Sequence, residues 1–157
     1  SFNLLKAVKE INQEQKDFFL SKIKDVLWII KDKTIGVLGL SFKPNTDDIR
    51  NAPSIDIIQA LQQEGARIRT YDPCAMEKAR RFLKDVRFCK DPYEVCRGSD
   101  CLLIVSEWDE FKELDFNRIK RLLKRPLIFD GRNIYDPQKL AKLGFRYVGI
   151  GRKGFKK

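Results

Sequence analysis

The sequence predicts an α/β protein with a doubly wound, mostly parallel sheet preceded by a long N-terminal helix. Short apolar runs alternate with amphipathic segments along most of the chain. Strands that alternate with helices are joined by right-handed crossovers, and this favours a parallel sheet with helices on both faces. The run Cys101–Val105 is continuously apolar, which is typical of a strand covered on both faces.

The composition fits a globular domain with a sizeable core. The chain has 157 residues, of which 43% are hydrophobic and 11% aromatic, and this composition argues against disorder. No apolar run approaches the roughly 20 residues that a membrane-spanning helix needs. Because the chain starts at Ser1 within a helical pattern and without an initiator Met, we expect a piece of a longer protein.

Apolar residues recur at helical spacing between residues 2 and 30 and predict the long first helix. The pattern weakens between residues 12 and 16, so a break near Lys16 or Asp17 is left open. Asp32-Lys33 marks the turn into the first strand.

The stretch from Lys33 to Ser54 joins a strand, a polar loop and the start of a helix. The strand covers residues 34–40, and Pro53 suits the first turn of the amphipathic helix that runs to Glu64. A fresh helix N-terminus behind a loop that carries cations and hydroxyl groups outlines an anion site.

The remaining chain continues the alternation. Strands are predicted at 67–71, 86–88, 101–105, 126–130 and 145–148, helices at 74–84, 92–97, 116–124 and 137–143, and a loop or helical turn at 108–114. Such a sheet is Rossmann-like, and its ligands bind beyond the carboxyl ends of the strands. Polar segments at 42–50, 106–108 and 130–133 follow strands, so we expect them to meet at that edge.

Lys and Arg exceed Asp and Glu by ten, which fits either a polyanionic partner or solvated helix faces and a basic tail. The tail holds four of these cations, Arg152, Lys153, Lys156 and Lys157. The other basic clusters fall in amphipathic helices without interleaved aromatic residues, which argues against a nucleic-acid track.

Cysteine usage argues against metal and nucleophile chemistry. The chain has no histidine and no C-x-x-C pair, and its four cysteines are Cys74, Cys89, Cys96 and Cys101. Zinc sites need closely paired Cys and His ligands, and a catalytic Cys–His pair is excluded for this chain. We therefore expect no metal, free thiols and a cytoplasmic location.

The best candidates for binding are cations in the loops that follow strands. Lys43, Arg50 and Arg132 are suited to phosphate, because charge-assisted hydrogen bonds are the strong ones, and Phe42 adds a stacking surface. The alternative is that Lys43 and Arg50 only balance the acidic residues at 47–48 of the same loop. The two glycines of the first strand do not complete a G-x-G-x-x-G pattern, so the pyrophosphate of a dinucleotide is not expected there.

Carboxylates that end strands have a structural alternative. Asp72 stands where a dinucleotide-binding domain keeps its ribose ligand, but without the glycines a turn-forming role before Pro73 is favoured. Glu107 and Asp130 are conceivable general bases, although a lone strand-end carboxylate is more often a cap or an arginine partner. No nucleophile–base pair is visible, so the sequence predicts binding and no catalytic residue.

Five motifs in a fixed order resemble the C-terminal domain of nucleotide-sugar dehydrogenases, the UDP-glucose/GDP-mannose dehydrogenase family. They are GLSFKPNTDDIRNAPS at 39–54, YDP at 71–73, SEWDEF at 106–111, FDGRNIYD at 129–136 and GIGR at 149–152. Within the family, residues 44–46 and 52–53 are most similar to the UDP-glucose 6-dehydrogenases, ahead of the GDP-mannose and UDP-N-acetylmannosamine enzymes.

The resemblance implies a role in substrate binding. Family enzymes oxidise the C6 alcohol of a UDP-sugar to a carboxylate in two NAD-dependent steps, through a thiohemiacetal on a cysteine. By the resemblance, Phe42, Lys43 and Arg132 contact the UDP-sugar, and Arg50 approaches NAD across the domain cleft. None of the four cysteines lies in a matching context, so this chain alone is implied to be inactive.

The resemblance also implies a domain division and partners. Residues 1–31 match the end of the central helical dimerisation region, and residues 32–157 match the Rossmann-like UDP-sugar-binding domain. The N-terminal NAD domain of the same polypeptide and a homodimer or higher assembly are the implied partners, while a membrane or nucleic acid is not. The alternative from another class is a nucleotide- or nucleic-acid-binding module without a redox role.

Overall fold

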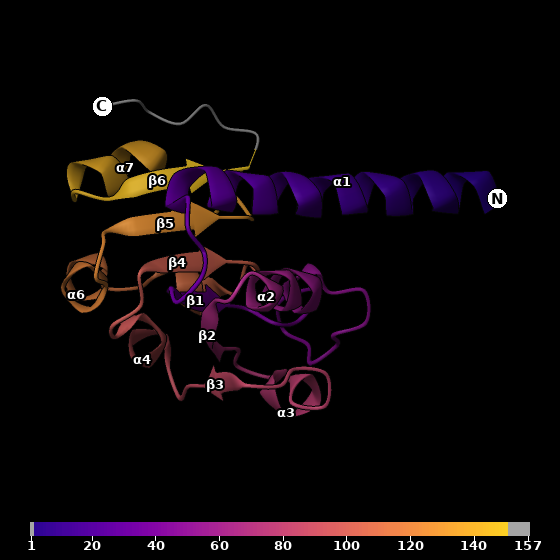
Figure 1. Cartoon of the computed structure of the whole chain (residues 1–157), viewed down its shortest axis with the longest axis horizontal. Helices are drawn as coiled ribbons and strands as arrows, with labels where there is room; N and C mark the ends of the chain where they lie inside the picture. Colours follow the sequence, from indigo (N-terminus) through magenta and orange to yellow (C-terminus); the bar gives the residue numbers. More distant parts are fainter. Residues whose placement is uncertain (1, 151–157) are drawn as a thin grey trace.

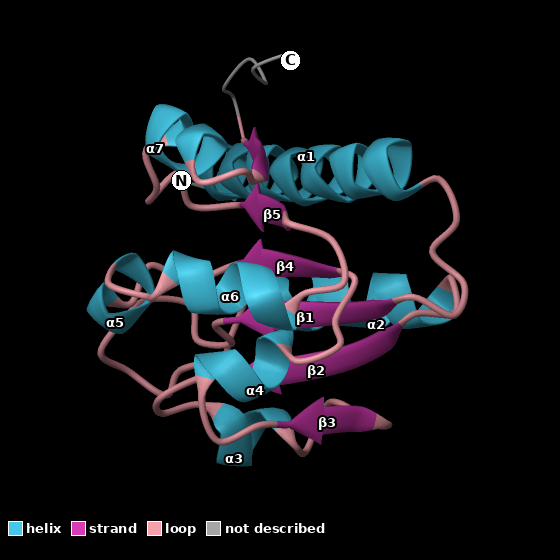
Figure 2. Ribbon diagram, turned by 90° about the vertical axis from the view of Figure 1, so that its left-hand side faces the viewer, coloured by secondary structure: helices cyan, strands magenta, loops and turns pink. Residues whose placement is uncertain are grey.

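The computed structural model describes residues 2–150, apart from the side chains of residues 2 and 5–12, so the basic tail lies outside the described residues. Helices cover both faces of a six-stranded parallel sheet (Figures 1 and 2). In chain order the elements are α1 (Phe2–Leu27), β1 (Thr34–Leu38), α2 (Pro53–Gln63), β2 (Arg67–Tyr71), α3 (Met76–Ala79), β3 (Val86–Phe88), α4 (Pro92–Cys96), β4 (Cys101–Ile104), α5 (Asp109–Lys112), α6 (Phe116–Leu122), β5 (Leu127–Asp130), α7 (Pro137–Lys142) and β6 (Arg146–Gly149).

The strand order is β3-β2-β1-β4-β5-β6, and all five pairings are parallel. The chain therefore winds outward from β1 in one direction and from β4 in the other, which confirms the predicted doubly wound sheet. Leu38 at the end of β1 pairs with Ile104 at the end of β4. The loops after these two strands thus start side by side at the point where the winding reverses, which is where such sheets bind ligands.

Two hydrophobic clusters, one on each face, explain the continuously apolar strands. Val37 and Leu103 belong to the cluster shared with α1, α2 and the region of α3. Leu38, Leu102 and Ile104 belong to the cluster under α4, α6 and α7. Because successive strand side chains point to opposite faces, both sets have to be apolar.

Helix α1 runs without a break from Phe2 to Leu27, so the break left open near residue 16 is not observed. Buried Phe19 and Ile23 pack on the sheet. The Lys16 ammonium lies 2.6 Å from the Asp56 carboxylate of α2. The N-terminal end of α1 projects past the sheet (Figure 1).

Helix α3 is shorter than the segment 74–84 predicted from the sequence. At its start, the backbone N–H groups of Cys74 and Ala75 are bonded to the Asp72 side chain. At its end, Arg81 and Phe82 donate to carbonyls three residues back, which tightens the backbone into turns. The prediction was wrong in length because periodicity does not register such capping bonds.

Candidate functional site

The loop after β1 is held by a single buried carboxylate. One oxygen of Asp72 accepts the backbone N–H groups of Leu40 at 2.7 Å and Ser41 at 3.1 Å. The other oxygen accepts the N–H groups of Cys74 and Ala75, both at 2.8 Å. Asp72 has no exposed surface. This confirms the predicted structural role, and it leaves no carboxylate oxygen for the ribose of a dinucleotide.

A close approach at the end of β1 fixes where the loop begins. Gly39 has a φ of +99°, and a Cβ atom placed there would lie 2.3 Å from the Cβ of Ser106. Only glycine therefore fits between the ends of β1 and β4. Ser106 is buried, and its hydroxyl has no hydrogen-bond partner among the described residues.

Ser41 connects three segments of the site edge. The buried indole of Trp108 donates its Nε1–H to Ser41 Oγ at 3.2 Å. Ser41 Oγ in turn donates to the backbone carbonyl of Lys43 at 2.7 Å. The residues after β4 thereby reach the backbone of the loop that carries Phe42 and Lys43.

Phe42 and Lys43 lie at the surface of this loop. Phe42 is 43% exposed, so part of its ring is open to solvent. The Lys43 ammonium lies 5.8 Å from the centre of the Phe42 ring, while the backbone N–H of Phe42 donates to the carbonyl of Asp48 at 2.8 Å. An aromatic face and a cation thus stand together on a loop whose backbone is bonded on both sides.

Arg132 lies two residues after β5, and it faces the residues that follow β4. Its Nη2 donates to Glu107 Oε1 at 2.8 Å, and both side chains are part-exposed. Asp130 is fully buried and accepts the backbone N–H groups of Arg132 and Tyr135. Glu107 is therefore an arginine partner and Asp130 a cap, the structural alternatives considered for these two carboxylates.

Arg50 is paired within its own loop. Its guanidinium bonds both oxygens of Asp48 at 3.0 Å, and its side chain is 86% exposed. The hydrogen bonds from Arg50 lower the pKa of Asp48 to about 2. In this structure Arg50 is therefore paired with an acidic residue of its own loop. For Lys43 no carboxylate partner is found among the described residues.

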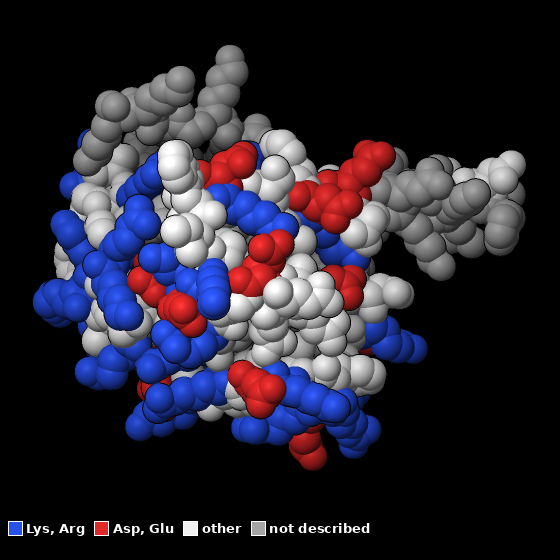
Figure 3. All heavy atoms as spheres, viewed as in Figure 1, with Lys and Arg blue, Asp and Glu red and all other residues white. Residues whose placement is uncertain are grey.

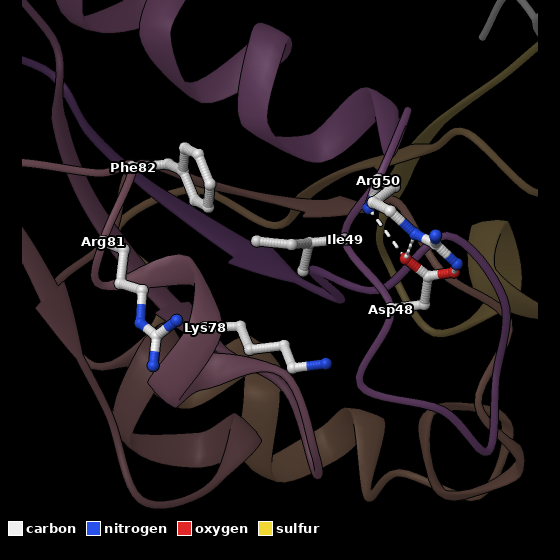
Figure 4. A pocket seen from close by; sticks show the side chains of 6 residues that line it. All are labelled: Asp48, Ile49, Arg50, Lys78, Arg81 and Phe82. Carbon is white, nitrogen blue, oxygen red and sulfur yellow. Dashed lines mark hydrogen bonds and ion pairs between the residues drawn. The ribbon is translucent and has the colours of Figure 1, made fainter.

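A shallow pocket of about 190 Å³ opens beside this loop (Figure 4). Ile49 and Phe82 give it apolar walls, and Lys78 and Arg81 supply cations, while the head of Arg50 turns toward Asp48. Phe42, Lys43 and Arg132 do not line it. The three predicted substrate residues therefore belong to an open sheet edge and not to this pocket.

A second group of cations lies away from the site. Lys and Arg side chains crowd the side of the molecule where α4 and α6 lie (Figure 3). Those that are exposed and free of ion pairs among the described residues include Arg97, Lys124, Arg125 and Arg146. These residues precede β4, precede β5 or begin β6. They therefore lie at the amino ends of the strands, opposite to the loops that carry the predicted site.

The cysteines and acidic residues form no metal centre in the described part of the chain, where no group of three or more ligating side chains occurs. Cys74 is exposed and the other three cysteines are buried and unpaired. Burial raises the pKa of the Cys96 thiol to about 12, so it is not an activated nucleophile. No helix between residues 2 and 150 has the length and apolarity to cross a membrane.

The structure brings together most of the predicted site. The loops after β1, β4 and β5 meet at the carboxyl ends of the strands. Trp108 contacts the loop after β1, and Glu107 contacts the loop after β5. Sequence reasoning did not identify Asp72, Glu107 and Trp108 as residues that hold the site loops. The signal was present for Asp72, because it directly follows a strand, but the partner of an indole N–H cannot be found from one sequence.

Known proteins match both the sequence and this arrangement. A profile described as the UDP-glucose/GDP-mannose dehydrogenase family, UDP binding domain, matches residues 36–137. The UDP-glucose 6-dehydrogenase of Rhizobium meliloti is 51% identical over 123 residues, which cover 78% of this chain and 28% of the relative. The UDP-glucose 6-dehydrogenase TuaD of Bacillus subtilis is 42% identical over 152 residues, covering 96% of this chain and 33% of the relative.

A solved structure shares the fold. The UDP-glucose dehydrogenase of the archaeon Pyrobaculum islandicum superposes with a TM-score of 0.79 at 31% identity, over 94% of this chain and 32% of that one. The chain thus spans about a third of the length of these relatives. The matched profile includes the loops after β1, β4 and β5. The chain belongs to the UDP-glucose/GDP-mannose dehydrogenase family and contains its UDP-binding domain.

Proposed function

We propose that this chain is the UDP-sugar-binding part of an NAD-dependent UDP-glucose 6-dehydrogenase. In this proposal Phe42 and Lys43 on the loop after β1 and Arg132 after β5 bind the UDP-sugar. The observation that carries it is the placement of two cations and one exposed aromatic ring at the switch-point edge of a sheet from the UDP-binding family.

The chemistry of the three side chains suits a uridine diphosphate. The Phe42 ring offers a face on which a base can stack, which is worth about 1–3 kcal/mol per base. Lys43 and Arg132 supply charge-assisted hydrogen bonds to phosphate oxygens. Both lie on loops that are anchored by buried carboxylates, Asp72 and Asp130. The backbone positions that carry these two cations are therefore fixed before a ligand arrives.

The cofactor belongs elsewhere in the proposal. NAD, when bound, accepts the hydride from the C6 carbon of the sugar. The residues present do not fit it at this edge, because the glycine pattern is absent and both Asp72 oxygens are occupied. We assign NAD to an N-terminal domain of the same polypeptide, with Arg50 reaching toward it from this chain. The exposure of Arg50 supports that assignment.

The proposal also includes domain boundaries and an oligomeric state. Residues 1–31 would be the end of the central helical dimerisation region, and residues 32–157 the UDP-sugar domain. The full-length enzyme would be a homodimer or larger. We propose a cytoplasmic location, since free thiols, one of them the exposed Cys74, suit a reducing compartment. In this proposal the chain supplies no catalytic residue and would be inactive on its own.

The proposal is tested by titrating the 157-residue chain with UDP, UDP-glucose, GDP and a short oligonucleotide. We expect UDP and UDP-glucose to bind with dissociation constants on the order of mM, because part of the ligand surface stays uncovered. The substitutions Lys43→Ala and Arg132→Ala should each remove detectable binding. The matched control Arg146→Ala, at the opposite edge, should leave it unchanged.

The outcomes separate the alternatives. Preferred binding of GDP would favour a GDP-mannose enzyme, and this would contradict the UDP-glucose assignment. Tight binding of the oligonucleotide that falls steeply with salt, with no binding of UDP, would favour a nucleic-acid module. In that case Arg146→Ala would weaken oligonucleotide binding, because the unpaired cations lie on that side.

A further inference from the structure

The residues that follow β4 stand between the two loops assigned to substrate. Strand β4 pairs with β1 on one side and with β5 on the other. The Val105 backbone N–H donates to the carbonyl of Leu38, and the Gly131 N–H donates to the carbonyl of Ile104. Glu107 and Trp108 follow Val105 after one residue, Ser106. Because β4 lies between β1 and β5, this position is next to the loops that follow both neighbouring strands.

Trp108 acts on the loop after β1. Its indole N–H bonds Ser41 Oγ, and the same hydroxyl bonds the carbonyl of Lys43. The ring is only 8% exposed and packs in the cluster under α4 and α6. A rigid, buried ring thus fixes the rotamer of Ser41, which fixes the backbone between Phe42 and Lys43.

Glu107 acts on the loop after β5. Its carboxylate holds one guanidinium nitrogen of Arg132 at 2.8 Å. An arginine side chain has five N–H donors in a planar fork, so one bond to Glu107 leaves donors for a phosphate. The side chains are 41% and 37% exposed, so this pair is not part of the core. Its evident effect is to restrict the rotamers of Arg132.

We infer that Glu107 and Trp108 are positioning residues, which together set the geometry of the two nucleotide-binding loops. The inference rests on the proposed function, since it takes Lys43 and Arg132 as the phosphate contacts. Neither Glu107 nor Trp108 has to touch the ligand for this role. A single dipeptide therefore sets the spacing between the cations of two loops that are about 90 residues apart in the chain.

For Trp108 the test compares two tryptophans. Trp108→Phe keeps an apolar ring and removes the indole N–H, and Trp28→Phe is the matched control because Trp28 is 88% exposed. We expect Trp108→Phe to weaken UDP binding by about three- to tenfold, the value of one hydrogen bond, and the control to leave it unchanged. Amide hydrogen exchange at Phe42 should rise in Trp108→Phe only, since that N–H is bonded within the loop.

For Glu107 the test separates orientation from charge. If the carboxylate orients Arg132, Glu107→Ala should weaken UDP binding by about three- to tenfold, and Glu107→Gln should restore it to within about twofold, because an amide oxygen still accepts the bond. If the carboxylate only repels the diphosphate, both variants would bind UDP more tightly, and the inference would be overturned for Glu107. The exposed neighbour Asp109 provides the control Asp109→Asn.

Failure of the inference is distinct from failure of the proposed function. If the unmodified chain binds no UDP in a titration, the proposed function falls. The exchange measurement then still decides on Trp108, since unchanged exchange at Phe42 would overturn its positioning role. If UDP binds and none of the variants changes either readout, the proposed function stands and the inference is wrong.

Discussion

Replacing Asp72 with alanine should be among the most destabilising single changes in this chain. The carboxylate accepts three well-buried backbone N–H groups, those of Leu40, Ser41 and Ala75, and one part-buried N–H group. Each buried donor that loses its partner costs about 1–3 kcal/mol. Counting only the three buried donors, because water can reach the part-buried amide, we expect the free energy of unfolding to fall by at least about 3 kcal/mol, a large share of a typical total of about 5–15 kcal/mol.

The assay is urea unfolding followed by circular dichroism at pH 7, with Asp136→Ala as the matched control. Asp136 caps α7 through one exposed bond to the Gln138 N–H, and losing such a cap costs about 0.5–2 kcal/mol. Asp72→Asn keeps one acceptor oxygen and should fall between the two alanine variants. The reasoning is refuted if Asp72→Ala is no more destabilising than Asp136→Ala.

Three further results are expected from the same structure. A thiol reagent should modify Cys74 rapidly in the folded protein and reach the three buried cysteines only on unfolding; fast modification of more than one thiol would contradict the burial. The Asp48 carboxyl should titrate near pH 2 by NMR, and Arg50→Ala should return its pKa toward 3.8. Because the folded pKa is depressed, this pair contributes stability above pH 3.8 and loses it as the pH falls through 2. Gly39→Ala should destabilise the fold by at least about 2 kcal/mol, since a Cβ atom would meet Ser106 at a φ of +99°; an unchanged urea midpoint would contradict this close approach between Gly39 and Ser106.

The architecture could be predicted because apolar runs, and their alternation with amphipathic segments, are visible in a single sequence. The run at Cys101–Val105 identified a strand buried on both faces, and the sheet has hydrophobic clusters on both. Alternating elements predicted the doubly wound order. Helix ends were harder to predict, as α3 shows. There the Asp72 side chain accepts the hydrogen bonds of the backbone amides that would otherwise begin the helix.

The sequence predicted which residues form the candidate site, but not the contacts that hold them in position. Cations after strands pointed to Lys43 and Arg132, since residue type and strand position are both visible in the sequence. The contacts of Glu107 and Trp108 were not visible, because they depend on which strands are neighbours and on side-chain rotamers. Arg50 shows the remaining ambiguity, since an arginine two residues from an aspartate fits either a loop pair or a cofactor contact.

Helix α1 has a consequence for where this polypeptide can be cut. Its residues Phe19, Ile23 and Leu27 are buried in the same cluster as the sheet, and Lys22 bonds the carbonyl of Gly149 at the far strand. A shorter protein that began at Lys31 would lack this helix and would expose to water the apolar sheet residues that the helix covers, and such patches promote aggregation. A recombinant form for binding studies should therefore retain the chain from before Phe19 onward.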